Sequence, residues 1–152
     1  MNYGIIIMLV AIVLSIIYLL KYNNKFSITI VVLQSIAVVA ALSGTILAFF
    51  SSYFFAIAIL ITCFYPVIYK KNFSTPKKRY LFWFFLFPLI IKFVFRILYL
   101  PGSNFIALSM LIPMSIFVYV LMNRKNWIYE IGFMITFFAD ALCRFIALQI
   151  TP

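Results

Sequence analysis

The chain has 152 residues, of which 68% are hydrophobic and 9% are charged. A soluble domain carries about 25% charged residues because its surface must be wetted, so this composition excludes a soluble globule and favours a protein whose solvent is lipid. The net charge of +10 does not indicate nucleic acid as a partner, because the basic residues fall in short gaps between apolar runs.

Five apolar runs follow one another along the chain. Because they are apolar throughout, with no alternation of polar residues, they predict helices rather than the strands of a membrane barrel. A helical span needs about 20 apolar residues, so the longest run, 28–69, is divided into two spans at a turn that we place at Ser51 and Ser52. The resulting spans are about 4–20, 28–48, 52–69, 80–100, 105–122 and 127–149. The first is expected to be a retained span and not a signal peptide.

Nine of the twelve Lys and Arg residues lie in three gaps between these spans. They are Lys21, Lys25, Lys70, Lys71, Lys77, Lys78, Arg79, Arg124 and Lys125. With six spans all three gaps face one side, and loops rich in Lys and Arg stay in the cytoplasm. The sequence therefore predicts an all-α, polytopic, multi-pass protein of the cell (inner) membrane. Its single domain would be a bundle of six transmembrane helices with both termini non-cytoplasmic.

Four charged residues fall deep inside the spans: Lys92, Arg96, Asp140 and Arg144. A charge near the bilayer centre costs about 2.5–3.5 kcal/mol and normally faces the bundle. Each pair is spaced i,i+4 on one helix face, and all four lie roughly 18–25 Å from the cytoplasmic end at about 1.5 Å per residue. We expect one layer in the outer half of the membrane, in which Asp140 neutralises one cation, most locally Arg144. The other cations either reach the outer headgroups or bind an anion.

Other polar residues of the last span are secondary candidates. Glu130 lies in its first turn, where we expect a solvated carboxylate favoured by the helix dipole. Thr136 continues the face of Asp140, and Cys143 lies beside Arg144. Since the chain has no histidine and no spaced cluster of ligands, we expect no cofactor, metal site or disulfide framework.

Residues 95–103 read Phe-Arg-Ile-Leu-Tyr-Leu-Pro-Gly-Ser. This stretch resembles the Phe-Lys-Ile-Met-His-Trp-Pro-Gly-Ala signature of the L-type inner-membrane motor protein of Bacteroidetes gliding and type 9 secretion, and of related uncharacterised membrane proteins. The similarity covers one hairpin, about 81–122, which in that family carries ion-driven motion in a complex with a single-span partner. The resemblance implies that Arg96 stands at the family's intramembrane Lys and Tyr99 at its His. Tyr does not titrate near neutral pH, and the span 105–122 lacks the family's coupling Glu.

The function that we expect is non-catalytic. The protein would be a small carrier or a subunit of a membrane complex, and Lys92, Arg96, Asp140 and Arg144 would bind an anionic or lipid-like ligand. Expected partners are the lipid bilayer, an anionic lipid or small anion, and other membrane subunits or further copies of the chain. Two alternatives stay open. An ion-coupled motor or channel subunit would use Asp140 as its protonatable group, and a membrane-embedded enzyme would use Cys143 as a thiolate nucleophile.

Overall fold

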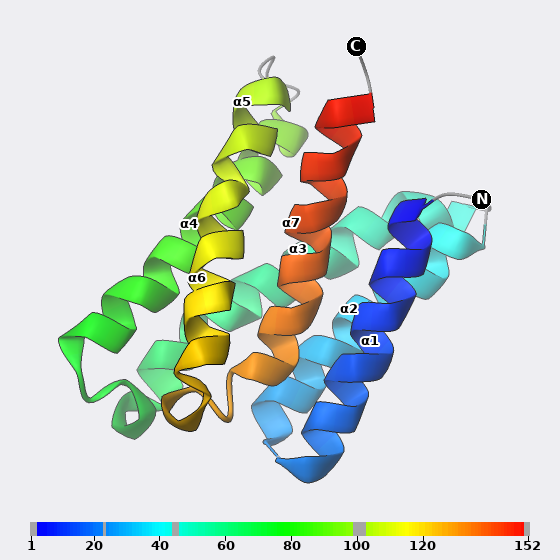
Figure 1. Cartoon of the computed structure of the whole chain (residues 1–152). Coiled ribbons are helices and arrows are strands. Elements are labelled where there is room, and N and C mark those ends of the chain that lie inside the picture. The colour runs from blue at the N-terminus through cyan, green and yellow to red at the C-terminus, as the bar shows by residue number, and fades with distance from the viewer. Residues whose placement is uncertain (1–2, 23, 44–45, 99–102, 151–152) are drawn as a thin grey trace.

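A computed structural model describes residues 3–22, 24–43, 46–98 and 103–150 (Figure 1). Over these residues the protein is all-helical and contains no strand. The helices are α1 (Tyr3–Lys21), α2 (Lys25–Leu42), α3 (Ile46–Ile68), α4 (Pro76–Ile97), α5 (Ser103–Ser109), α6 (Leu111–Met122) and α7 (Ile131–Ile150), with short 3-10 helices η1 (Lys70–Phe73) and η2 (Arg124–Asn126).

Within the part of the chain that the structure describes, four helical stretches are long and apolar enough to cross a membrane. They are Tyr3–Lys21, Lys25–Leu42, Phe50–Ile68 and Phe105–Met122.

The predicted turn at Ser51 and Ser52 is wrong, because both residues lie within α3. The preceding helix ends at Leu42, where the backbone N–H of Ser43 bonds to the carbonyls of Val39 and Ala40. Serine hydroxyls can be satisfied inside a helix by bonding to carbonyls of the previous turn, so two serines do not mark a chain reversal. The predicted boundary therefore lies several residues too late, because apolar length and loop charge indicate how many spans there are but not where a helix ends.

The predicted span 105–122 is broken at Met110 into α5 and α6. The break lies three to four residues before Pro113, which has no N–H to donate to the carbonyl of Ser109, the last residue of α5. Pro66 and Pro88 lie inside α3 and α4, which continue through them as single helices. Two helices begin earlier than predicted: α2 begins after Asn24, whose side chain caps it, and α4 begins at Pro76. The last helix begins later than predicted, at Ile131 and not near 127.

Helix α7 lies at the centre of the arrangement, in contact with α1, α2, α5 and α6 (Figure 1). It approaches α1 closely at Gly132, where an added Cβ would lie 2.9 Å from Cδ2 of Leu19. Helix α4 meets α7 through aromatic rings, with Phe82 against Phe133 and Phe85 against Phe137. These buried rings form the middle of the core.

The three basic loops lie at one end of the bundle, at the bottom of Figure 1. We call this the basic end. The first turn of α1 and the last turn of α7 lie at the other end, which we call the terminal end. One polar group, around the buried Glu130, lies near the basic end, and a second, partly buried group around Lys92 and Asp140 lies nearer the terminal end.

Candidate ligand site

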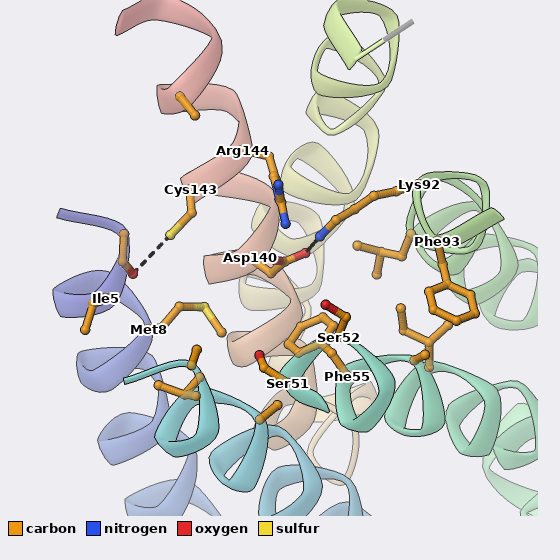
Figure 2. A pocket seen from close by; sticks show the side chains of 18 of the residues that line it. Ile5, Met8, Ser51, Ser52, Phe55, Lys92, Phe93, Asp140, Cys143 and Arg144 are labelled. Carbon is orange, nitrogen blue, oxygen red and sulfur yellow. Dashed lines mark hydrogen bonds and ion pairs between the residues drawn. The ribbon is translucent and has the colours of Figure 1, made fainter. Parts of the chain in front are cut away.

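A cavity of about 640 Å³ opens toward the terminal end between α1, α2, α3, α4 and α7 (Figure 2). Most of its wall is apolar, with Ile5 and Met8 on α1 and Phe55 on α3. Charged groups gather on one side, where α4 and α7 contribute Lys92, Asp140 and Arg144. Cys143 of α7 and Ser51 and Ser52 of α3 also line the cavity. This combination of an apolar chamber with a few convergent polar groups is typical of a small-molecule site.

The ion pair between Lys92 and Asp140 joins α4 to α7 across the cavity. The side chains are only 13% and 14% exposed, respectively. The ammonium also lies 5.5 Å from the ring centroid of Phe55, a cation–π distance. The sequence favoured Arg144 as the closest partner of Asp140, whereas the structure pairs Asp140 with Lys92 from another helix.

Arg144 points from α7 toward this ion pair (Figure 2). Its side chain is exposed, and among the described residues no carboxylate forms a salt bridge with it. Two cations and one carboxylate leave the described polar wall with a net charge of +1. A guanidinium presents several donors in a planar fork that matches carboxylate and phosphate oxygens, so Arg144 can bind an anion while the Lys92–Asp140 pair stays intact.

The remaining predicted site residues are dispersed. Thr136 is buried below the cavity, where its hydroxyl bonds to Oε1 of Gln34 and to the carbonyl of Phe133. Cys143 lines the cavity and its thiol donates to the carbonyl of Gly4 at 3.4 Å. The side chain of Arg96 and the whole of Tyr99 lie outside the described residues.

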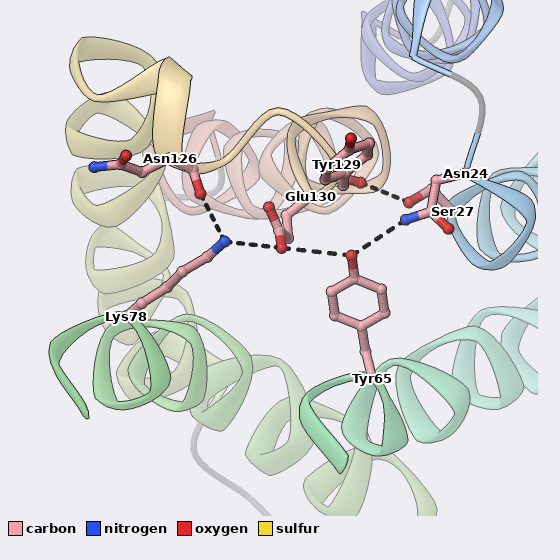
Figure 3. A network of polar contacts seen from close by, with 7 residues as sticks. All are labelled: Asn24, Ser27, Tyr65, Lys78, Asn126, Tyr129 and Glu130. Carbon is pink, nitrogen blue, oxygen red and sulfur yellow. Dashed lines mark hydrogen bonds and ion pairs between the residues drawn. The ribbon is translucent and has the colours of Figure 1, made fainter. Parts of the chain in front are cut away.

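Glu130 is not solvated as the sequence suggested, because it is 0% exposed. It lies in the turn just before α7 and forms an ion pair of 3.0 Å with Lys78 at the start of α4 (Figure 3). Lys78 in turn donates to the carbonyl of Asn126 at 2.6 Å and lies 4.9 Å from the ring centroid of Trp127. The loop around η2 therefore folds over the carboxylate and removes it from solvent.

Two further helices join this network. The hydroxyl of Tyr65, in α3, donates to Oε1 of Glu130 at 3.4 Å, and Nδ2 of Asn24 donates to that hydroxyl at 3.2 Å. Burial raises the pKa of the Glu130 carboxyl, and the ammonium of Lys78 is the main influence that opposes this rise. Hydrogen bonds and an ion pair therefore link four segments that are distant in sequence, and the buried carboxylate of Glu130 is their common centre.

Sequence reasoning treated Lys78 as one of nine loop cations and gave Tyr65 and Asn24 no role. A basic residue at a helix start predicts orientation in the membrane, but nothing local distinguishes Lys78 from Lys77. Lys77 is exposed and Lys78 is half-buried, because successive residues of α4 point in different directions and the loop around η2 covers Lys78.

Comparison with known protein families, with curated proteins and with solved structures finds no match. The resemblance of residues 95–103 to the motor family therefore stays a prediction, and any statement about function rests on the geometry of this chain alone.

Proposed function

We propose that the protein is a non-catalytic, six-span protein of the cell (inner) membrane that binds an anionic, lipid-like ligand in the terminal-end cavity. The positive-inside rule supports an orientation in which the basic end is cytoplasmic and both termini are outside. The cavity would then open in the outer half of the bilayer. The protein would serve as a small carrier or as a subunit of a larger membrane complex.

One observation carries the proposal: Arg144 points into a largely apolar cavity whose only described carboxylate, Asp140, is already paired with Lys92. A neutral ligand would leave this excess charge without compensation in a setting of low polarity, which is costly. An anionic headgroup provides the missing charge, and Ile5, Met8 and Phe55 provide a surface for an apolar tail.

Photolabelling of the full chain in nanodiscs tests the proposal. The probe is phosphatidylglycerol with a diazirine in its acyl chain, in a phosphatidylcholine host, and labelled peptides are mapped by mass spectrometry. Residues 55–59 and 140–147 should be labelled, and unlabelled phosphatidylglycerol should compete more strongly than phosphatidylcholine with the same chains. The variant Arg144→Gln should lower this labelling roughly fivefold, the effect of about 1 kcal/mol per basic residue near an anionic headgroup.

The matched control is Arg124→Gln, which removes an exposed arginine from the basic end. It should leave cavity labelling unchanged. The proposal fails if Arg144→Gln and Arg124→Gln behave alike while both variants elute and melt as the parent protein does. It also fails if zwitterionic lipid competes as well as anionic lipid.

A further inference from the structure

A second hollow of about 840 Å³ lies along the α1–α2 hairpin, and its lining on α2 runs from Ile28, near the basic end, to Ser43. Its floor is formed by the buried side chains of Leu19, Val31 and Ala40. Its sides are exposed apolar residues of the two helices, with Phe54 of α3 closing the far end. These are Ile16 and Leu20 on α1, and Ile28, Val32, Ile36 and Val39 on α2. We call this hollow the hairpin groove.

The hairpin groove follows one face of α2, because its residues recur at helical spacing from Ile28 to Val39. The lining of α2 from Ile28 to Ser43 rises about 22 Å, within a hydrocarbon core that is about 30 Å thick. The groove is therefore long enough to hold one acyl chain of one leaflet.

Its two hydroxyls do not make the groove polar. Ser35 donates to the carbonyl of Val31 at 2.8 Å and Ser43 donates to that of Ala40 at 2.7 Å, so both bond within their own helix. An occupant consequently meets a wall that offers apolar contact along its whole length.

Cations mark the basic end of the groove. Lys25 stands one helical turn before Ile28 on the same stripe of α2, and Lys21 directly follows Leu20 on α1. Both are exposed, and neither forms a salt bridge with a carboxylate of the described residues. An apolar groove with two such ammonium groups at one end matches an amphiphile with an anionic headgroup.

We propose that the hairpin groove binds an anionic phospholipid, with one acyl chain along α2 and its phosphate between Lys21 and Lys25. A second copy of the chain fits less well, because its two carboxylates, Glu130 and Asp140, are both held in ion pairs and neither can meet these lysines. Tight helix association in lipid also prefers small residues, whereas this stripe consists of Ile and Val. The site is distinct from the terminal-end cavity and does not depend on it.

The test uses the full chain in phosphatidylcholine nanodiscs with diazirine-bearing phosphatidylglycerol at limiting amount. Labels should concentrate on residues 16–20 and 28–39, and unlabelled phosphatidylglycerol should displace them better than phosphatidylcholine with the same chains. The double variant Lys21→Gln/Lys25→Gln should reduce this labelling roughly 30-fold, from about 1 kcal/mol per basic residue. The matched variant Lys70→Gln/Lys71→Gln should leave it unchanged.

Steric blocking gives a second, independent measurement. Val32→Trp fills the groove and should abolish its labelling, whereas Val13→Trp, at a lipid-facing residue of α1 that lines neither hollow, should not. Arg144→Gln should leave groove labelling at the parent level, which separates this site from the cavity. The proposal is overturned if labels spread evenly around the protein, if the lysine variant labels normally, or if cross-links join two copies of α2.

Discussion

The two buried ion pairs use the same chemistry in opposite surroundings. Lys78 and Glu130 are enclosed by the ring of Trp127, the carbonyl of Asn126 and the hydroxyl of Tyr65. Lys92 and Asp140 lie in the wall of a cavity with a further cation beside them. The closed pair connects segments of the chain, whereas the open pair faces space that a ligand can enter. Burial of a charge alone therefore does not distinguish a structural site from a binding site, but the balance of charge and space around it does.

The largest effect should follow from breaking the closed pair. Glu130→Ala leaves the ammonium of Lys78 buried without its carboxylate, and removing one partner of a buried pair costs about 3–5 kcal/mol. We expect this loss in the free energy of unfolding, measured by titration with a denaturing detergent. The double variant Glu130→Leu/Lys78→Met removes both charges and should recover much of the loss. Stability of Glu130→Ala equal to that of the parent would show that the network contributes little.

The open pair should respond differently to loss of its acid. Asp140→Asn leaves Lys92 and Arg144 uncompensated, but water or an anion can reach them through the cavity, so the cost should be nearer 1–3 kcal/mol. The net charge of the described wall rises from +1 to +2, because one carboxylate is removed. Photolabelling of the cavity by anionic phosphatidylglycerol should therefore increase roughly fivefold. Unchanged or weaker labelling in a folded variant would contradict an anion-binding role.

The same comparison shows which features the sequence could predict. Composition and apolar runs predicted an all-helical chain, and the structure agrees over its described residues. The asymmetry of charge predicted that the three basic loops face one side, and they lie at one end of the bundle. These features depend on averages over many residues, such as hydropathy and loop charge. Misjudging the role of a single residue therefore does not change their prediction.

Details that depend on one contact between distant segments could not be predicted. Glu130 is buried because Lys78, 52 positions earlier, and Tyr65, 65 positions earlier, come to it in three dimensions. The spacing of Lys92 and Asp140 placed them at one depth, but their direct pairing requires α4 and α7 to face each other. The turn misplaced at Ser51 and Ser52 has a local cause instead, since serine hydroxyls can bond to carbonyls of their own helix and so do not mark its end.

A smaller change in the network around Glu130 tests whether Tyr65 contributes to its stability. Tyr65→Phe keeps the ring and removes the hydroxyl that donates to Glu130 and accepts from Asn24. We expect a loss of about 1 kcal/mol in the free energy of unfolding, the usual net value of a hydrogen bond. Tyr80→Phe, at an exposed position of α4, is the control and should change stability less. Equal effects of the two substitutions would remove Tyr65 from the network.

The smallest effect should come from substituting Cys143. This substitution distinguishes ligand binding from thiol chemistry as the function of the same cavity. Its thiol donates to the carbonyl of Gly4, and sulfur is a weak donor, so Cys143→Ala should cost at most about 0.5 kcal/mol. Labelling by phosphatidylglycerol should be unchanged, because the charges of Lys92, Asp140 and Arg144 remain. Cys63→Ala provides the matched control, since Cys63 is also half-buried but lies outside this cavity. A cellular function that is lost with Cys143→Ala and kept with Cys63→Ala, at normal stability and labelling, would instead favour an enzyme that uses the thiol.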